Sequence, residues 1–386
     1  MLNLETLNLG MMKTTHKIYF KNSRNMRVIP DSSVHLVVTS PPYPMIEMWD
    51  DMFVSQNKNI LMALKNSDGS KAFELMHQTL DQVWQELYRI LINGGIACIN
   101  IGDATRTVGD NFRLYANHAR ILNSLLKIGF SALPLIIWRK PTNAPNKFMG
   151  SGMLPGGAYV TLEHEYVLIV RKGSKREFNS GSEKQTRRES ALFWEERNNW
   201  FSDVWFGLIG TRQKLKKTAT RLRSGAFPFE LAYRLVNMYS AKGDTVVDPF
   251  LGTGTTMWSA MASGRSCVGF EIETGFKEVI AASQDTVMAA SNDCIRQRIN
   301  DHLAFVASRL ADKGKLKYIN RHYQFPVMTR QEIELFINPL ESVEQSAKNC
   351  FEVAYAITPD QQFEGDWKDM IPDTSKAAKS RQLQLF

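Results

Sequence analysis

The stretch Val34-His-Leu-Val-Val-Thr39-Ser40-Pro41-Pro42-Tyr43 decides how the rest of the chain is arranged. Its first six residues are rich in β-branched side chains and predict a buried strand. The two prolines end that strand at once, because neither can donate a hydrogen bond to a sheet. The strand tip then carries the Ser40 hydroxyl, the Pro41 carbonyl and the aromatic face of Tyr43, which together suit a planar molecule with an amino group, such as a nucleobase. A stiff strand-to-loop turn is the other explanation of the prolines.

A second strand tip lies far downstream, in Asp244-Thr-Val-Val-Asp248-Pro249-Phe250-Leu251-Gly252-Thr253-Gly254-Thr255-Thr256. An apolar strand there leads into a glycine-rich turn and a helix, which is how α/β sheets bring backbone close to a nucleotide-like ligand. About twenty residues past the glycines, a further strand ends in Glu271, where a carboxylate can accept ribose hydroxyls. No Lys follows the glycines, so a Walker-type phosphate loop is excluded, and Met257 replaces the third glycine of the dinucleotide fingerprint.

The ligand predicted by the second strand tip therefore lacks a pyrophosphate. S-Adenosylmethionine is such a ligand, because its ribose suits a carboxylate such as Glu271. Its amino-acid end carries charges that suit backbone groups and an acid such as Asp248.

The two motifs together resemble the amino-methylating DNA methyltransferases, in the β-type order where the catalytic motif precedes the cofactor motif. The resemblance covers about residues 17–285. It implies an α/β fold with a doubly wound, mainly parallel, seven-stranded Rossmann-like sheet and helices on both faces. It also implies methyl transfer from S-adenosylmethionine to a base flipped out of double-stranded DNA, in a restriction-modification system whose endonuclease acts on the same site.

The resemblance favours the N4 amine of cytosine as the methyl acceptor. Members that methylate the N6 amine of adenine usually have Asp or Asn where this chain has Ser40. Adenine N6 methylation stays open as the nearer alternative, and a DNA-binding protein with an inactive methyltransferase fold is the more distant one.

The resemblance also assigns site residues. The predicted catalytic residues are Ser40, Pro41, Pro42 and Tyr43. The predicted cofactor contacts are Asn22, Thr39, Phe227, Asp248, Pro249, Phe250, Gly252, Gly254, Thr255, Thr256 and Glu271. Asn22-Ser23 stands where the family usually has Gly-Asp, so the expected contact there is an amide on the adenine edge.

Positive charge indicates a nucleic-acid partner. The net charge is +8, and residues 171–223 alone contain 14 Lys/Arg against 6 Asp/Glu. Seven Phe and Trp residues between 178 and 206 are interleaved with these cations, a mixture typical of contact with phosphates and bases. The DNA contacts predicted from this segment are Arg187, Arg188, Arg212, Lys214, Lys216, Lys217, Arg221 and Arg223. Upstream, Arg139-Lys-Pro-Thr-Asn143 resembles the family's catalytic-face loop, which implies Lys140, Asn143 and Lys147 as further contacts. A solvated surface loop is the alternative.

The chain is predicted to divide into four parts. These are a catalytic half (17–172), a basic and aromatic DNA-recognition region (173–224), a cofactor-binding half (225–290) and a helical C-terminal extension (291–386).

The four cysteines and seven histidines show no metal-ligand or disulfide spacing, so no metal is expected. No apolar run is long enough for a membrane helix, so we expect a cytoplasmic protein on bacterial or archaeal DNA, as monomer or homodimer.

Overall fold

The computed structural model describes residues 12–140, 149–208 and 227–359. At its centre lies β2 (Val34–Thr39), in which Val34 and every residue from Leu36 to Thr39 are buried. A run of buried residues is typical of a strand that is covered on both faces of a parallel sheet. β2 ends directly before Ser40, so the predicted strand tip is confirmed.

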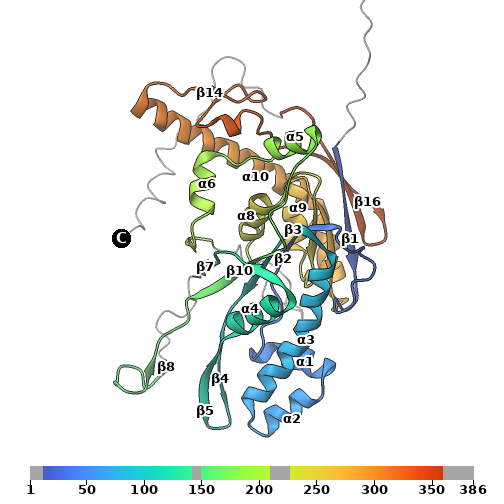
Figure 1. Ribbon diagram of the computed structural model, residues 1–386, viewed down its shortest axis with the longest axis vertical. Helices are drawn as coiled ribbons and strands as arrows, with labels where there is room; N and C mark the ends of the chain where they lie inside the picture. Colours follow the sequence, from blue (N-terminus) through green and yellow to red (C-terminus); the bar gives the residue numbers. More distant parts are fainter. Residues whose placement is uncertain (1–11, 141–148, 209–226, 360–386) are drawn as a thin grey trace, which may run out of the picture.

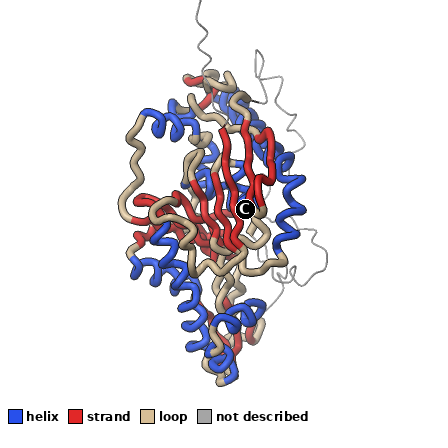
Figure 2. Tube along the Cα trace, turned by 90° about the vertical axis from the view of Figure 1, so that its right-hand side faces the viewer, coloured by secondary structure: helices blue, strands red, loops and turns tan. Residues whose placement is uncertain are grey.

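One large sheet organises the molecule (Figures 1 and 2). It has eleven strands in the described residues. Its spatial order is β11 (Val204–Trp205), β7 (Ile136–Arg139), β10 (His164–Lys172), β3 (Leu91–Ile101), β2, β12 (Thr245–Asp248), β13 (Ser266–Phe270), β1 (Met12–Tyr19), β17 (Cys350–Tyr355) and β16 (Leu340–Ala347), with β6 (Phe130–Ala132) paired to β10. The run from β3 to β1 is parallel, and β10 lies antiparallel to β3. The expected α/β sheet is thus the run of seven strands from β7 to β1, and further strands extend it at both edges.

Helices cover both faces of this sheet (Figure 1). Leu36 and Val38 of β2 pack into one hydrophobic core, and Val37, between them in sequence, packs into the other. The first core is closed by α8 (Phe229–Tyr239), α9 (Thr255–Ala262) and α10 (Phe276–Lys313), and the second by α3 (Gly69–Ile90) and α4 (Asn117–Ile128). With both faces covered, ligands can reach the sheet only at its strand ends. None of the described helices is both long and apolar enough to cross a membrane.

Smaller elements lie at the two ends of the long axis in Figure 1. One end carries η1 (Glu47–Trp49), α1 (Asp50–Gln56), α2 (Asn59–Lys65) and the hairpins β4 (Ala104–Val108)–β5 (Asn111–Tyr115) and β8 (Met149–Gly150)–β9 (Ala158–Tyr159). The other end carries α5 (Gly181–Glu189), α6 (Trp194–Trp200), β14 (Tyr318–Ile319), β15 (Pro326–Val327) and η2 (Arg330–Glu332).

The prediction of a helical C-terminal extension is wrong for the described residues that follow α10. The chain leaves that helix at Gly314, which has a positive φ of 75°, and later forms the β16–β17 hairpin. β17 pairs antiparallel with β1, which would otherwise expose a row of unpaired backbone groups at the sheet edge. Phe351, Val353 and Tyr355 are buried at alternate positions, which is the period of a strand and not of a helix.

Candidate active site

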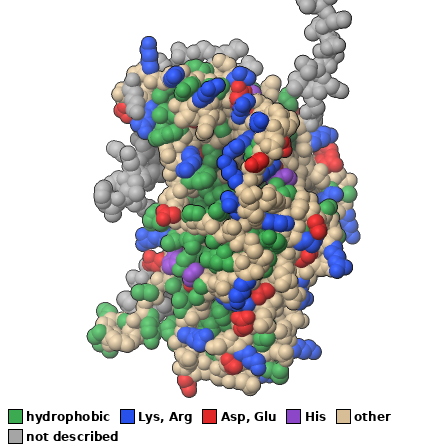
Figure 3. All heavy atoms as spheres, in the orientation of Figure 1, with side chains coloured by type: hydrophobic (Ala, Val, Ile, Leu, Met, Phe, Trp, Pro, Cys, Tyr) green, Lys and Arg blue, Asp and Glu red, His purple; other side chains and the backbone are tan. Residues whose placement is uncertain are grey.

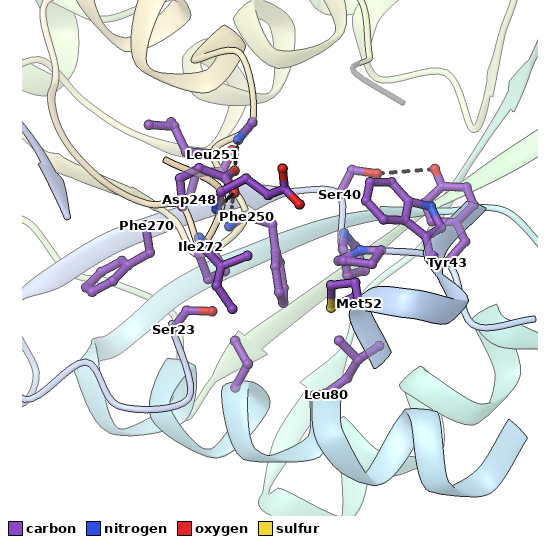
Figure 4. Close-up of a pocket in the computed structure, with 18 of the residues that line it drawn as sticks. Ser23, Ser40, Tyr43, Met52, Leu80, Asp248, Phe250, Leu251, Phe270 and Ile272 are labelled. Atoms are coloured by element: carbon purple, nitrogen blue, oxygen red, sulfur yellow. Dashed lines mark hydrogen bonds between the residues drawn. The ribbon is translucent and has the colours of Figure 1, made fainter. Parts of the chain in front are cut away.

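The strand tips of β2, β12 and β13 surround a cavity of about 470 Å³ (Figure 4). Because β10 is antiparallel, its first residues reach the same edge of the sheet, with Tyr166 opposite Ile101 at the end of β3. Apolar side chains from α1 and α3, including Met52, Leu80 and Val83, line another wall. A partly apolar cavity of this size suits a ligand as large as a nucleoside.

Asp248 joins three elements at the bottom of this site. It ends β12, and its carboxylate accepts hydrogen bonds from Thr39 Oγ1 of β2 at 2.6 Å and from Thr256 Oγ1 of α9 at 2.7 Å. The backbone N–H of Phe250 donates to the same group at 3.0 Å. Burial raises the pKa of Asp248 to about 6, because desolvation outweighs these three donors. A cation placed against this carboxylate would favour its charged form.

Glu271 stands directly after β13 and is held by backbone amides. The N–H of Gly252 donates to Oε2 at 2.8 Å, and the N–H of Glu273 donates to Oε1 at 2.7 Å. Gly252 has φ +53° and Gly254 has φ +91°, so both adopt the left-handed conformation that glycine takes without strain. The glycine turn thereby brings its backbone to the carboxylate. Burial raises the pKa of Glu271.

The Ser-Pro-Pro-Tyr segment lies across the cavity from Ser23 and Phe270 (Figure 4). Ser40 Oγ donates to the Tyr43 hydroxyl at 3.2 Å, which leaves the serine oxygen free to accept a hydrogen bond. Pro41 is buried and Pro42 half-buried, and both line the cavity. The segment therefore presents an acceptor and rigid backbone to any group that enters between the strand tips.

Three further side chains fix Tyr43. Its hydroxyl donates to Glu165 Oε2 at 2.8 Å and accepts from Asn100 Nδ2 at 3.0 Å. Glu165 is buried, and its other oxygen is paired with Lys140 Nζ at 2.6 Å. Burial and the neighbouring Glu165 raise the pKa of Tyr43, so the phenol stays protonated. The predicted stacking residue is thus anchored at its hydroxyl by a charged network.

The structure places the remaining predicted cofactor residues around the same cavity. Phe227, Pro249, Phe250 and Thr255 line it. Asn22 lines it too, but its amide is engaged with Gln56 and Arg24. Thr39, Gly254 and Thr256 stand behind the wall, where the two threonines hold Asp248 and Gly254 begins α9. Two buried acids and an apolar wall fit an adenosine with a cationic end. No His, Cys, Asp and Glu side chains of the described residues group in a way that could hold a metal ion.

Comparison with known proteins identifies the family. A family model described as DNA methylase, for N6 and N4 methyltransferases, matches residues 34–282. The chain is 49% identical over 345 residues to the type II methyltransferase M.MthZI of Methanothermobacter thermautotrophicus. This similarity covers 89% of this chain and 96% of that protein. The chain belongs to the N6/N4 DNA methylase family. The methylase is also 50% identical over 278 residues to the type II methyltransferase M.MjaI of Methanocaldococcus jannaschii, with 69% of this chain and 90% of that protein covered.

A solved structure supports the same relationship. The methylase is similar to TTHA0409 of Thermus thermophilus, a candidate DNA modification methylase crystallised with S-adenosyl-L-methionine. The TM-score is 0.53 at 29% identity, and the similarity covers 71% of this chain and 95% of that one. A ligand of the type predicted from the strand tips is therefore present in a related fold.

Two residues of the methylase site were missed in the sequence. Asn100 and Glu165 come from neighbouring antiparallel strands, and only their pairing brings them together, with Asn100 Nδ2 donating to Glu165 Oε2 at 2.6 Å. The available signal was a polar residue at the end of an apolar run in each case. Lys140, one of the predicted DNA contacts, forms an ion pair with Glu165 in the structure.

Two further predicted DNA contacts lie among the described residues, and neither lines the cavity. Arg187 and Arg188 lie on α5, along a groove at the amino ends of β2 and β3, whereas the cavity lies at the carboxyl ends. The remaining predicted contacts lie outside the described residues: Asn143, Lys147, Arg212, Lys214, Lys216, Lys217, Arg221 and Arg223.

Several aromatic residues expected to contact bases belong to the protein interior instead. Phe193, Trp200 and Trp205 are 0%, 7% and 1% exposed. Phe193 and Trp200 are buried by the attachment of α6 to α10, where Glu196 pairs with Arg298 Nε at 2.5 Å and Nη2 at 2.8 Å. Trp205 lies in β11, which pairs with β7 at the edge of the sheet. Of the seven aromatics, Phe206 is the most exposed, at 61%.

Proposed function

We propose that this DNA methylase transfers a methyl group from S-adenosylmethionine to the N4 amine of a cytosine rotated out of double-stranded DNA. The observation that carries the proposal is the meeting of two strand tips at one cavity, Ser40-Pro41-Pro42-Tyr43 after β2 and Asp248 to Thr256 after β12. S-Adenosylmethionine is the cofactor of the family, and it supplies a methyl group already activated on a sulfonium. The protein has to align an amine with that methyl group.

In this proposal Glu271 and Asp248 bind different parts of the cofactor. Glu271 accepts hydrogen bonds from the ribose hydroxyls, because its oxygens keep free lone pairs beyond their two backbone donors. Asp248 faces the amino-acid end, where its charge attracts the ammonium group. The apolar wall at Leu80 and Val83 receives the adenine ring.

Ser40 orients the acceptor. An exocyclic amine is conjugated with its ring, and its lone pair must be released before it can attack. Hydrogen bonds from the amine to Ser40 Oγ and to the Pro41 carbonyl favour a pyramidal nitrogen and stabilise the positive charge that develops on it. Tyr43 stacks on the base, and the links from its hydroxyl to Asn100 and Glu165 hold the ring in place.

Base rotation costs a few kcal/mol, which contacts in the complex have to offset. Stacking on an aromatic ring contributes roughly 1 to 3 kcal/mol per base. Phosphate contacts from those cations of residues 173–224 that reach the duplex in the active site contribute the remainder, with a strong dependence on salt. We accordingly assign 17–172 to acceptor binding, 225–290 to cofactor binding and 173–224 to DNA recognition.

Mass spectrometry of nucleosides tests the acceptor. DNA from a methylation-free host that expresses the methylase should contain N4-methylcytosine. N6-methyladenine without N4-methylcytosine would overturn the cytosine assignment and leave the fold and cofactor site intact. Absence of both products would favour the inactive DNA-binding alternative.

A role in restriction-modification is part of the proposal. Both relatives described above are type II methyltransferases. Host DNA modified by the methylase should resist a restriction endonuclease that cleaves the same sequence. Cleavage of fully modified DNA by every endonuclease tested against the mapped site would contradict this role.

A further inference from the structure

The methylase has a second large depression at the opposite edge of its sheet. It is a groove of about 1130 Å³ at the amino ends of β2 and β3, next to His35 and Ile96. Five residues separate His35 from Ser40 along β2, which is a rise of about 17 Å. Figure 3 shows this side of the molecule, where Lys and Arg side chains border an apolar hollow in the upper half. The groove and the active-site cavity therefore open at opposite ends of the same strands.

The groove is strongly positive. Its lining cations are Arg171, Lys175, Arg176, Lys184, Arg187, Arg188, Arg197, Arg321 and Arg330. Two acids of the described residues line it, and both are already engaged: buried Glu332 accepts from the backbone N–H groups of Trp194 and Thr329, and Glu334 pairs with Arg321 at 2.9 Å. Among the described residues, Lys184, Arg188 and Arg330 have no carboxylate partner. Such a concentration of unpaired cations attracts an extended polyanion.

Aromatic rings hold part of this charge in position. The guanidinium groups of Arg176 and Arg187 lie over Phe178, at 4.5 and 4.9 Å from its centroid. Arg197 lies over Phe201 at 4.2 Å. Stacking on a ring restricts a guanidinium group and leaves the N–H edges of Arg187 and Arg197 available to phosphate oxygens, whereas Arg176 donates its terminal N–H groups to the carboxylate of Asp244. The groove is therefore prepared for phosphates before any ligand arrives.

We propose that this groove binds the phosphate backbone of a second DNA segment, separate from the duplex whose base enters the active site. A straight duplex on the carboxyl edge cannot enter a groove on the amino edge, because the sheet lies between them. The cations extend from the end of β10 over α5 and α6 to η2, which is too wide a span for a single small anion. A chain that acts on long DNA meets such a second segment whenever the DNA folds back, and binding it would keep the methylase on the polymer between encounters with its site.

Binding stoichiometry tests the proposal. The probe is a duplex of about 14 base pairs and arbitrary sequence, roughly 48 Å long, added to the full-length methylase at low salt and analysed by native mass spectrometry. Wild-type protein should bind two duplexes per chain. The triple variant Lys184→Gln, Arg188→Gln, Arg330→Gln should bind one duplex. The slope of log affinity for long DNA against log salt concentration should also become smaller in magnitude by about 2 to 3, because each lost phosphate contact contributes about 0.9.

A matched control removes the same charge elsewhere. Lys13, Lys17 and Lys348 are exposed on β1 and the β16–β17 turn, and their change to Gln should leave two duplexes bound. Saturating duplex should also protect Lys175 and Lys184 from acetylation while Lys13 and Lys348 stay reactive. One duplex on the wild type, a second duplex retained by the triple variant, or unprotected groove lysines would each overturn the proposal. The readouts do not depend on methyl transfer, so a missing N4-methylcytosine product would refute the proposed function and leave this one standing.

Discussion

The active-site cavity and the basic groove lie at opposite ends of the same strands and have opposite electrostatics. The cavity holds two buried acids, Asp248 and Glu271, whose pKa values are raised by burial. The groove holds exposed cations, several of them without a carboxylate partner among the described residues. A buried acid costs desolvation energy that a cationic ligand can offset, whereas an exposed cation keeps its hydration and acts through long-range attraction. The cavity is thus suited to a small cationic cofactor and the groove to a polyanion.

The strongest test of the cavity is Ser40→Ala. Loss of one hydrogen-bond acceptor for the developing charge should lower kcat by roughly 10² to 10³ while cofactor affinity is unchanged. Ser33→Ala is the matched control, because Ser33 lies just before the other end of β2 and donates to Pro30 O. Single-turnover methylation and calorimetry measure the two quantities. Equal activity of the two variants would remove Ser40 from catalysis.

Glu271→Ala should weaken cofactor binding without affecting the groove. Loss of the ribose acceptor is expected to cost about 1 to 3 kcal/mol, which is roughly 5- to 150-fold in Kd. Glu278→Ala, an exposed acid on the first turns of α10, serves as the control. Isothermal titration with S-adenosylmethionine measures both variants, and an unchanged Kd for Glu271→Ala would place the ribose elsewhere.

Cofactor affinity should depend on pH through Asp248. Its pKa is raised to about 6, so below pH 6 the carboxyl is largely protonated in the free protein and must lose its proton to attract an ammonium group. Affinity should therefore rise with pH by up to about tenfold per unit until pH 6 and then level off. The pKa of Glu271 is raised as well, so Asp248→Asn separates the two contributions. An identical pH profile in that variant would assign the dependence to another group.

The sharpest comparison with the DNA binding of the groove uses three lysines, Lys214, Lys216 and Lys217. They belong to the same basic part of the sequence but lie outside the described residues. Their joint change to Gln should lower the salt slope of DNA binding by about 2 to 3. A decrease on short duplexes that carry the target would place them on the active-site side. A decrease of the salt slope on long DNA alone would assign these lysines to the groove. Fluorescence anisotropy across a salt series measures both.

The sequence by itself determined the cavity. Strand tips carry their ligand residues in short contiguous stretches, so Ser40 to Tyr43, Asp248 to Thr256 and Glu271 could be found without knowing how the strands pair. Parallel strands place their carboxyl ends at one edge, and that rule alone brings these segments together. The α/β class and the helices on both faces were implied by the family resemblance that the same two motifs carry.

Only the tertiary structure decided what depends on contacts between distant segments. Asn100 and Glu165 meet because β10 runs antiparallel to β3, and the sequence does not state that direction. β17 joins the sheet because β1 offers it an edge, and Trp200 of α6 is buried because α10 lies beside that helix. The groove has the same origin: α5, α6 and η2 supply its cations from positions far apart in the chain. A count of charges indicated a polyanion, but the edge of the sheet at which it binds is a property of the fold.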